Sequence, residues 1–294
     1  MAGLKKALSG LAIVALGLTA VWDAPAGNRS QIENAVEILE RVDSGRALLE
    51  KAKAFWKLES RGDVLSVLKW GTASKTDATL TRHFDPKTGQ EVRERKVLIQ
   101  LRPGQSLHDL TLDIAHELVH ATSRPAFDPY DVALTPGKYI HQAIEGDGGE
   151  VEAVFAECQV AREIQSSFGL QAERCKHYFE NGEKDSSVTT SVLRKEKIKK
   201  DFYRVGSWRR ELIERLGRES TLFPILSADK PRLYSSTGGT PYPVALMGEY
   251  EEITRIACEN SRKRVAVLGA GRGPASSRSE AEESTRKFLA DRCH

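Results

Sequence analysis

The sequence predicts an α+β fold, with a small twisted sheet in the N-terminal part and a mostly helical C-terminal half. Three extended segments between residues 63 and 101 carry the β-branched and aromatic residues typical of strands, and the turn DPKTG joins the last two. Beyond residue 106, apolar residues recur at the spacing of amphipathic helices. The chain of 294 residues is 40% hydrophobic, which is enough to bury a sizeable core.

The first 26 residues have the pattern of a signal peptide. Lys5 and Lys6 precede the apolar run LSGLAIVALGLTAV, and small residues follow at 24–26. This run is shorter than the roughly 20 apolar residues that span a bilayer. We therefore expect cleavage of residues 1–26, a periplasmic or secreted mature protein, and no stable membrane insertion after cleavage.

Four cysteines fit an oxidising compartment, in which they can form two disulfides with three possible pairings. Nearness in the sequence favours Cys158 with Cys175 and Cys258 with Cys293. Four free buried thiols are the alternative. Because no pair has the CxxC spacing of a structural zinc site, we do not expect the cysteines to hold metal.

Two helices and then the strands are expected in the N-terminal part. Ser30 and Glu33 form a capping box at the start of SQIENAVEILERV, and GRALLEKAKAFW continues the helical pattern. The predicted strands are DVLSVLKW, DATLTRHF and EVRERKVLIQL.

Helices are expected from residue 106 onward. The first covers 106–122 and is opened by Ser106; others follow at about 149–166 and 191–217. The last has a basic face opposite an apolar one, which favours a packed amphipathic helix over attachment to an anionic surface. We expect one domain over residues 27–258. Residues 259–294 are expected to form a partly flexible tail that ends in a short helix.

The helix at 106–122 contains the motif HELVH, in which the histidines are His116 and His120. On a helical wheel they lie together, opposite the apolar face. Two imidazoles one turn apart can bind one zinc ion through bonds of about 2 Å and leave other positions open. Glu117 lies a quarter-turn away, where its carboxylate can act on a water beside the ion. We therefore expect Glu117 to be the general base.

The third ligand is not given by this motif. The longer motif HExxHxxGxxH requires glycine at 123 and histidine at 126, but the sequence has Ser123 and Ala126, which excludes that class. We expect Glu150 as the ligand, at the start of a helix capped by Asp147. Glu157 shares its face and is expected to support the site or to substitute for Glu150 as the ligand, whereas Glu152 points away. Rival ligands are His141, Asp128 and Asp131.

HELVH followed by GGEVEAV resembles the gluzincin zinc metallopeptidases, whose third ligand is a glutamate. The resemblance covers about residues 90–165 and places Glu150 first in the glutamate segment. The aspartate that ends this segment in the group is replaced by Val154, so the surroundings of the ligands must differ. The resemblance implies a zincin-like fold with its active-site cleft between the sheet and the helical half.

In such peptidases a tyrosine or histidine helps to hold the oxyanion. The expected catalytic residue is His141, because it lies between the two ligand helices in the sequence. Alternatives for this role are Tyr139, His177 and Tyr242.

The sequence therefore predicts a zinc metallopeptidase that hydrolyses protein or peptide substrates outside the cytoplasm. We expect the segment KVLIQL (96–101) at the near edge of the sheet, where an extended substrate can add to it by backbone hydrogen bonds. The alternatives are a non-catalytic binding or scaffolding protein and a hydrolase of cell-wall peptides. A net charge of +3 gives no reason to expect nucleic acid as a partner.

Overall fold

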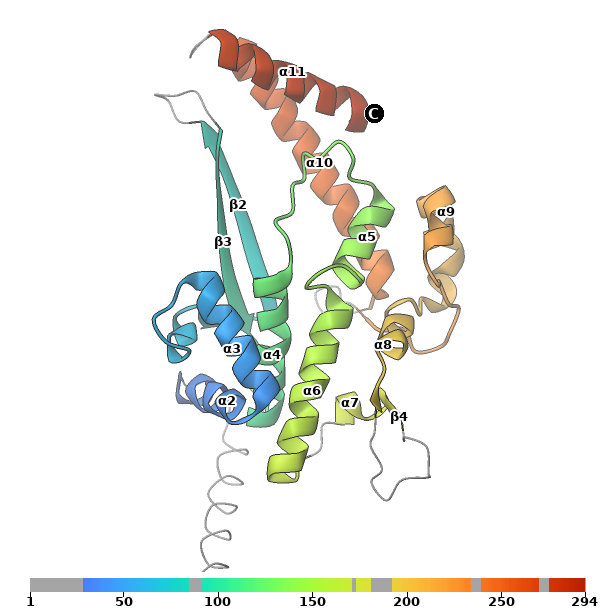
Figure 1. Ribbon diagram of the computed structural model, residues 1–294. Coiled ribbons are helices and arrows are strands. Elements are labelled where there is room, and N and C mark those ends of the chain that lie inside the picture. Colours follow the sequence, from blue (N-terminus) through green and yellow to red (C-terminus); the bar gives the residue numbers. More distant parts are fainter. Residues whose placement is uncertain are drawn as a thin grey trace, which may run out of the picture. The chain divides into compact units, whose positions relative to one another are not determined.

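The fold is α+β and mostly helical, with a small three-stranded sheet (Figure 1). The computed structural model describes residues 29–84, 91–170, 173–180, 192–233, 239–269 and 275–293. The predicted signal peptide at 1–26 therefore lies outside the described residues. Within these ranges, no helix has the length and apolar character needed to cross a membrane.

The chain forms two compact units, each built from separate stretches of sequence. The described parts of Met1–Asp77, Val97–Arg124 and Asp147–Ile198 form unit 1. The described parts of Ala78–Lys96, Pro125–Gly146 and Lys199–His294 form unit 2. The single domain expected over 27–258 thus draws on both units.

Four helices form the core of unit 1. These are α2 (Arg29–Arg41), α3 (Asp43–Trp56), α4 (Leu107–Ser123) and α6 (Glu150–Phe168). Figure 1 shows α6 running alongside α4, and α2 and α3 also pack on α4. Consequently α4 is buried around most of its circumference, whereas the wheel pattern suggested one apolar face. The predicted capping of this helix is confirmed, because the Ser106 side chain accepts a hydrogen bond from the Asp109 amide at 3.1 Å.

The sheet contains β1 (Leu68–Trp70), β2 (Lys75–Phe84) and β3 (Glu91–Leu101), in the order β1-β3-β2. β1 pairs with β3 in parallel, with Leu68 opposite Ile99. The prediction that KVLIQL lies at the sheet edge is wrong, because β3 is the central strand. It lies between β1 and β2, and β1 pairs with the end of this segment at Ile99–Leu101.

The predicted strand DVLSVLKW is only partly correct. Its first half is a 3₁₀ helix, η1 (Gly62–Ser66), and only the last three residues form β1. The Asp63 carboxylate accepts a hydrogen bond from the Ser60 amide at 2.8 Å, and Val67 N–H donates to the Val64 carbonyl at 3.0 Å. These short-range bonds satisfy the backbone locally, so the segment turns before it enters the sheet.

The helix expected over 191–217 is interrupted. It consists of α8 (Lys195–Phe202), the 3₁₀ helix η2 (Gly206–Trp208) and α9 (Arg209–Leu216). The Leu226 amide donates to the Tyr203 carbonyl, and the Val205 amide donates to the Leu226 carbonyl, both at 2.9 Å. Gly206 adopts a φ of +56°, which other residues rarely adopt. This pairing with a distant segment replaces the helical hydrogen bonds.

The C-terminal part is more helical than the predicted tail. Helix α10 (Tyr242–Gly269) continues through residue 258, and α11 (Ala275–Arg292) packs beside it (Figure 1). Phe288 is buried in a cluster with Ala257 and Cys258, against which Tyr130 and Cys293 pack. Unit 2 also contains α5 (Pro136–Ile144) and the 3₁₀ helix η3 (Gly217–Leu222).

Both predicted disulfides are present and no cysteine is free. Cys258–Cys293 joins the second half of α10 to the residue that follows α11. Cys158–Cys175 joins α6 to the short helix α7 (Glu173–Lys176). After α7, the strands β4 (Phe179–Glu180) and β5 (Val192–Leu193) form a second, two-stranded sheet.

Candidate metal centre

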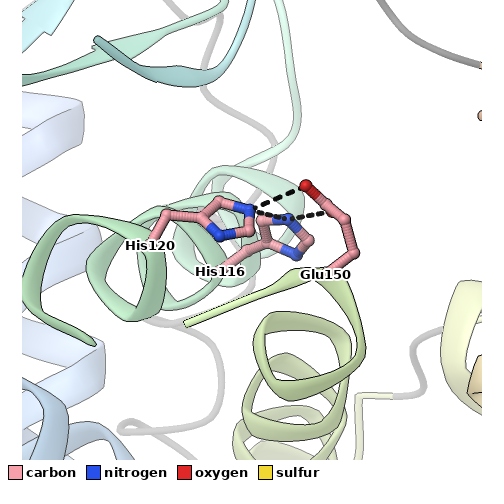
Figure 2. Close-up of side chains that lie close together, drawn as sticks. All are labelled: His116, His120 and Glu150. Atoms are coloured by element: carbon pink, nitrogen blue, oxygen red, sulfur yellow. Dashed lines mark hydrogen bonds and ion pairs between the residues drawn. The ribbon is translucent and has the colours of Figure 1, made fainter. Parts of the chain in front are cut away.

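Helix α4 presents two histidines on the side where α6 begins. The Nε2 atoms of His116 and His120 are 3.1 Å apart, because residues four apart on a helix lie one above the other. Figure 2 shows both rings pointing toward the first residue of α6. The helix predicted from the HELVH motif therefore places these side chains as expected.

Glu150 completes a group of three. Its Oε1 atom lies 3.2 Å from His120 Nε2, and its Oε2 atom lies 3.3 Å from His116 Nε2 (Figure 2). An ion with tetrahedral bonds of about 2.0–2.1 Å has ligand atoms about 3.3–3.4 Å apart. The three side chains are therefore spaced as ligands of a single zinc-sized ion.

The other nitrogen of each imidazole has its own partner. His120 Nδ1 lies 2.7 Å from the Gly148 carbonyl oxygen, and His116 Nδ1 lies 3.0 Å from Glu157 Oε2. Both partners accept hydrogen bonds, so Nδ1 carries the proton and Nε2 is left with a lone pair. Arg124 Nη2 is 3.2 Å from His120 Nδ1, but a guanidinium can only donate, and the shorter contact decides the tautomer.

Gly148 can fulfil this role because it is glycine. Its φ is +65°, and a Cβ atom at this position would lie 2.3 Å from the Arg124 amide nitrogen. Both facts exclude a side chain at the point where the backbone approaches His120. In the sequence, the run of glycines before Glu150 is the one hint of this role.

The start of α6 differs from the prediction. The N-cap is Gly149, without a side-chain hydrogen bond, so the expected cap by Asp147 is wrong. Two glycines separate Asp147 from the helix, and the side chain is exposed. Instead, the Glu152 carboxylate accepts a hydrogen bond from the Gly148 amide at 2.9 Å. Glu152 therefore stabilises the turn that carries the Gly148 carbonyl and is not one of the three grouped side chains.

Charge is buried at this centre to an unusual degree. Among the described residues, the buried carboxylates and imidazoles are Glu117, His120, Glu150 and Glu157. All four belong to α4 and α6. Buried charges are costly unless they are paired or coordinate a metal. The segregation of all four to one place favours a ligand site over a chance pair of histidines.

The electrostatics favour a positive charge between the three side chains. Burial alone lowers the pKa of His116, but the neighbouring Glu150 and Glu157 outweigh it and raise this pKa to about 10. Burial alone raises the pKa of Glu150, but His120 and His116 hold it well below its usual range. Without an ion, a proton supplies the positive charge, and a divalent cation can take its place.

Glu117 is buried on α4 and is held by a residue of β2. The Thr76 hydroxyl donates to Glu117 Oε2 at 2.8 Å and lies 3.0 Å from the Glu117 carbonyl oxygen. This contact orients the carboxylate of the predicted general base. No spacing in the sequence pointed to Thr76, since it lies on another element.

Further ionic contacts surround the group. The Arg174 guanidinium contacts Glu157 Oε1 at 2.7 Å and Asp113 Oδ1 at 2.8 Å. The expectation that Glu157 supports the site is consistent with its contact to His116. The only sequence signal for Arg174 was the predicted disulfide, since it brings residue 175 to residue 158.

The rival ligands have other roles in unit 2. The carboxylates of Asp128 and Asp131 accept hydrogen bonds from the amides of Tyr130 and Ala133. His141 is exposed on α5, and its predicted catalytic role stays a prediction.

The remaining oxyanion candidates are divided between the units. Tyr139 donates a hydrogen bond to Glu249, and Tyr242 begins α10, both in unit 2. His177 is exposed just after α7, in unit 1.

A second group in the described part of the chain could offer metal ligands: Glu157, Cys158 and Cys175. Its two sulfur atoms are joined in a disulfide and are not available as thiolates. His116, His120 and Glu150 are therefore the candidate ligand set.

Comparisons of the chain with protein-family models, with curated proteins and with solved structures found no match. The chemistry of the centre is therefore inferred from its own geometry.

Proposed function

We propose that this protein is a zinc-dependent metallopeptidase of the gluzincin type, which hydrolyses peptide bonds in proteins or peptides. The observation that carries the proposal is the group of His116, His120 and Glu150. Their facing atoms are separated by 3.1–3.3 Å, and each imidazole is held by a separate acceptor. A buried carboxylate, Glu117, lies on the same helix.

The ligand types favour zinc over other common ions. Two imidazoles and one carboxylate are a typical catalytic zinc set, which leaves a fourth position for water or substrate. Magnesium and calcium prefer sites made of oxygen atoms only. A purely structural zinc site usually has four protein ligands, whereas three are grouped here.

Each residue of the centre has a defined task. His116, His120 and Glu150 would hold the ion, and Thr76 orients Glu117. A bound zinc ion supplies a Lewis acid that lowers the pKa of a nearby water to about 7 and polarises a carbonyl group. Glu117 would take the proton from the attacking water and deliver it to the leaving amine. We retain His141 as the proposed partner of the oxyanion.

An extracellular or periplasmic location is part of the proposal. Two disulfides suit an oxidising compartment, and they agree with the expected signal peptide. A substrate strand would need a strand at the sheet edge, and β2 rather than β3 lies there. Thr76 of β2 contacts Glu117, so this edge would bring a substrate near the proposed base.

The decisive experiment combines metal analysis with a cleavage screen on protein, peptide and peptidoglycan substrates. Purified protein should contain one zinc ion, and a chelator should abolish cleavage. Glu117→Gln should keep the zinc and lose turnover by at least about 100-fold, since a general base typically contributes 10²–10⁴-fold. Glu37→Gln, an exposed site on α2, is the matched control and should behave as wild type.

The outcomes distinguish the competing functions. Zinc without chelator-sensitive cleavage of any substrate would favour a non-catalytic binding or scaffolding protein. Cleavage restricted to peptidoglycan would identify a cell-wall hydrolase. Full turnover by Glu117→Gln would exclude the proposed base.

A further inference from the structure

An ion pair connects the candidate metal centre to a disulfide. Glu157 contacts His116 Nδ1 through Oε2 at 3.0 Å and Arg174 Nε through Oε1 at 2.7 Å. The disulfide joins the residues that follow these two in the sequence, because Cys158 follows Glu157 and Cys175 follows Arg174. The covalent bond and the ion pair therefore bridge α6 and α7 side by side.

Arg174 also binds a second carboxylate, on α4. Its Nη1 atom is 2.8 Å from Asp113 Oδ1, and its Nη2 atom is 3.4 Å from the Asp109 carbonyl oxygen. The Asp113 carboxylate additionally accepts a hydrogen bond from the Ser74 hydroxyl. A planar guanidinium can serve two carboxylates at once in a defined geometry, which a lysine cannot do.

We propose that Arg174 is a positioning residue for the metal centre and that the Cys158–Cys175 disulfide holds Arg174 in place. The proposal rests on the metal centre proposed above. Arg174 fixes the Glu157 carboxylate so that its other oxygen meets His116 Nδ1–H. This hydrogen bond keeps the His116 ring oriented, with Nε2 toward Glu150 and His120.

The disulfide is needed because α7 has few other means of holding Arg174. The helix comprises only four residues, and Glu173, Arg174 and Lys176 are exposed, while Cys175 is buried. The Arg174 side chain retains 36% of its exposure, so its contacts alone compete with water. A covalent link to the residue next to Glu157 keeps the guanidinium beside both carboxylates. Without Arg174, Glu157 and Asp113 lose the cation they share, and Glu157 is free to turn from His116.

The test measures the zinc dissociation constant of the purified, oxidised full chain by competition with a chromophoric chelator. Arg174→Gln should weaken zinc binding by about 10-fold or more, the usual effect of losing a group that orients a ligand. Arg174→Lys should recover only part of the loss. Lys176→Gln, on the same helix but in a surface pair with Glu173, is the matched control and should bind zinc as wild type does.

The disulfide is tested by substitution, because thiol reductants themselves bind zinc. Cys158→Ala with Cys175→Ala should weaken zinc binding to a similar extent, whereas Cys258→Ala with Cys293→Ala should not. Adding Arg174→Gln to the first pair should cause little further loss, because both changes interrupt one series of contacts. If the first pair does not fold, Arg174→Gln and Arg174→Lys decide the question with the disulfide intact.

A spectroscopic signal separates positioning from general destabilisation. In zinc-loaded wild type, the His116 Nδ1–H proton should give a slowly exchanging NMR signal, which Arg174→Gln should lose while the His120 signal persists. Unchanged zinc affinity in Arg174→Gln would overturn this proposal and leave the metallopeptidase proposal standing. A wild-type chain that binds no zinc would overturn both. Weakening by Arg174→Gln but not by loss of the Cys158–Cys175 bond would overturn the role of the disulfide.

Discussion

The surroundings of the two disulfides differ sharply. Cys158–Cys175 lies beside a charged pair, with the buried Glu157 on one side and the partly exposed Arg174 on the other. Cys258–Cys293 lies in an apolar cluster with Ala257 and Phe288. Several charges of α10 and α11 instead form exposed pairs one turn apart, such as Lys287 with Asp291.

This difference distinguishes charges that are grouped at the candidate metal centre from charges on the surface of a packed helix pair. Exposed pairs contribute little to stability and can change without consequence, whereas buried charges persist only where something compensates their desolvation. The α4–α6 region contains such charges, whereas the residues of α10 and α11 whose burial is described (242–266 and 281–292) include no buried charged side chain. Five predictions, in order of decreasing effect, test whether the comparison holds.

The largest effect is expected for the third ligand. Glu150→Gln removes the only negative charge among the three proposed ligands and should lower zinc affinity by at least about 100-fold, more than a change in a supporting group. Glu157→Gln should lower it by about 10-fold, and Glu152→Gln should leave it nearly unchanged. Zinc retained after dialysis against a weak chelator reports all three. Loss of zinc from the 152 variant alone would refute the ligand assignment.

Zinc binding should weaken as the pH falls. The pKa of His116 is raised to about 10 in the metal-free protein, so zinc must displace a proton at neutral pH. One displaced proton corresponds to about 10-fold in affinity per pH unit. Isothermal titrations at pH 6, 7 and 8 in buffers of different ionisation enthalpy measure both the slope and the proton release. An affinity independent of pH would contradict a neutral His116 as ligand.

The same pKa has a consequence for the metal-free protein. Because the folded-state pKa lies above the usual value of 6.5, protonated His116 stabilises the fold fully below about pH 6.5. This stabilisation is lost as the pH rises toward 10. Denaturant titrations of metal-free protein should show the decline, and His116→Gln should remove it.

Replacing Gly148 should weaken zinc binding and stability more than replacing another glycine that has a positive φ. Gly148→Ala introduces both an unfavourable φ and a clash with Arg124, so we expect weaker zinc binding and a loss of stability of about 1–3 kcal/mol. Gly169→Ala has a similar φ of +74° but nothing within 4 Å of the new Cβ. It should cost about 1 kcal/mol and leave zinc affinity unchanged. Equal effects of the two on zinc would show that the Gly148 carbonyl does not hold His120.

The smallest effect is expected on α10. Arg255 forms exposed pairs with Glu252 and Glu259, so Arg255→Gln should leave zinc affinity and the thermal unfolding midpoint essentially unchanged. Thermal unfolding followed by circular dichroism provides the measurement. A substantial drop in the unfolding midpoint would mean that the charges on this helix pair contribute as much to stability as the buried charges of α4 and α6.

The sequence alone determined the features that depend on short stretches of chain. His116 and His120 come together because they are one helical turn apart, and Ser106 begins their helix by a local hydrogen bond. The wheel of the second helix placed Glu150 and Glu157 on one face. The pairing of cysteines near in sequence was likewise predicted correctly.

Contacts between segments that are far apart in the sequence could be seen only in the folded chain. Thr76 contacts Glu117, and Arg174 contacts Glu157. The Gly148 carbonyl contacts His120. Each pair is far apart in the sequence, so no periodic pattern predicts the contact. Backbone pairing with Leu226 interrupted a segment whose apolar spacing is that of one continuous helix. Local periodicity specifies which face a side chain occupies, but its partner is set by which elements pack together. The candidate ligands could therefore be predicted from the sequence, whereas the groups that contact them could not.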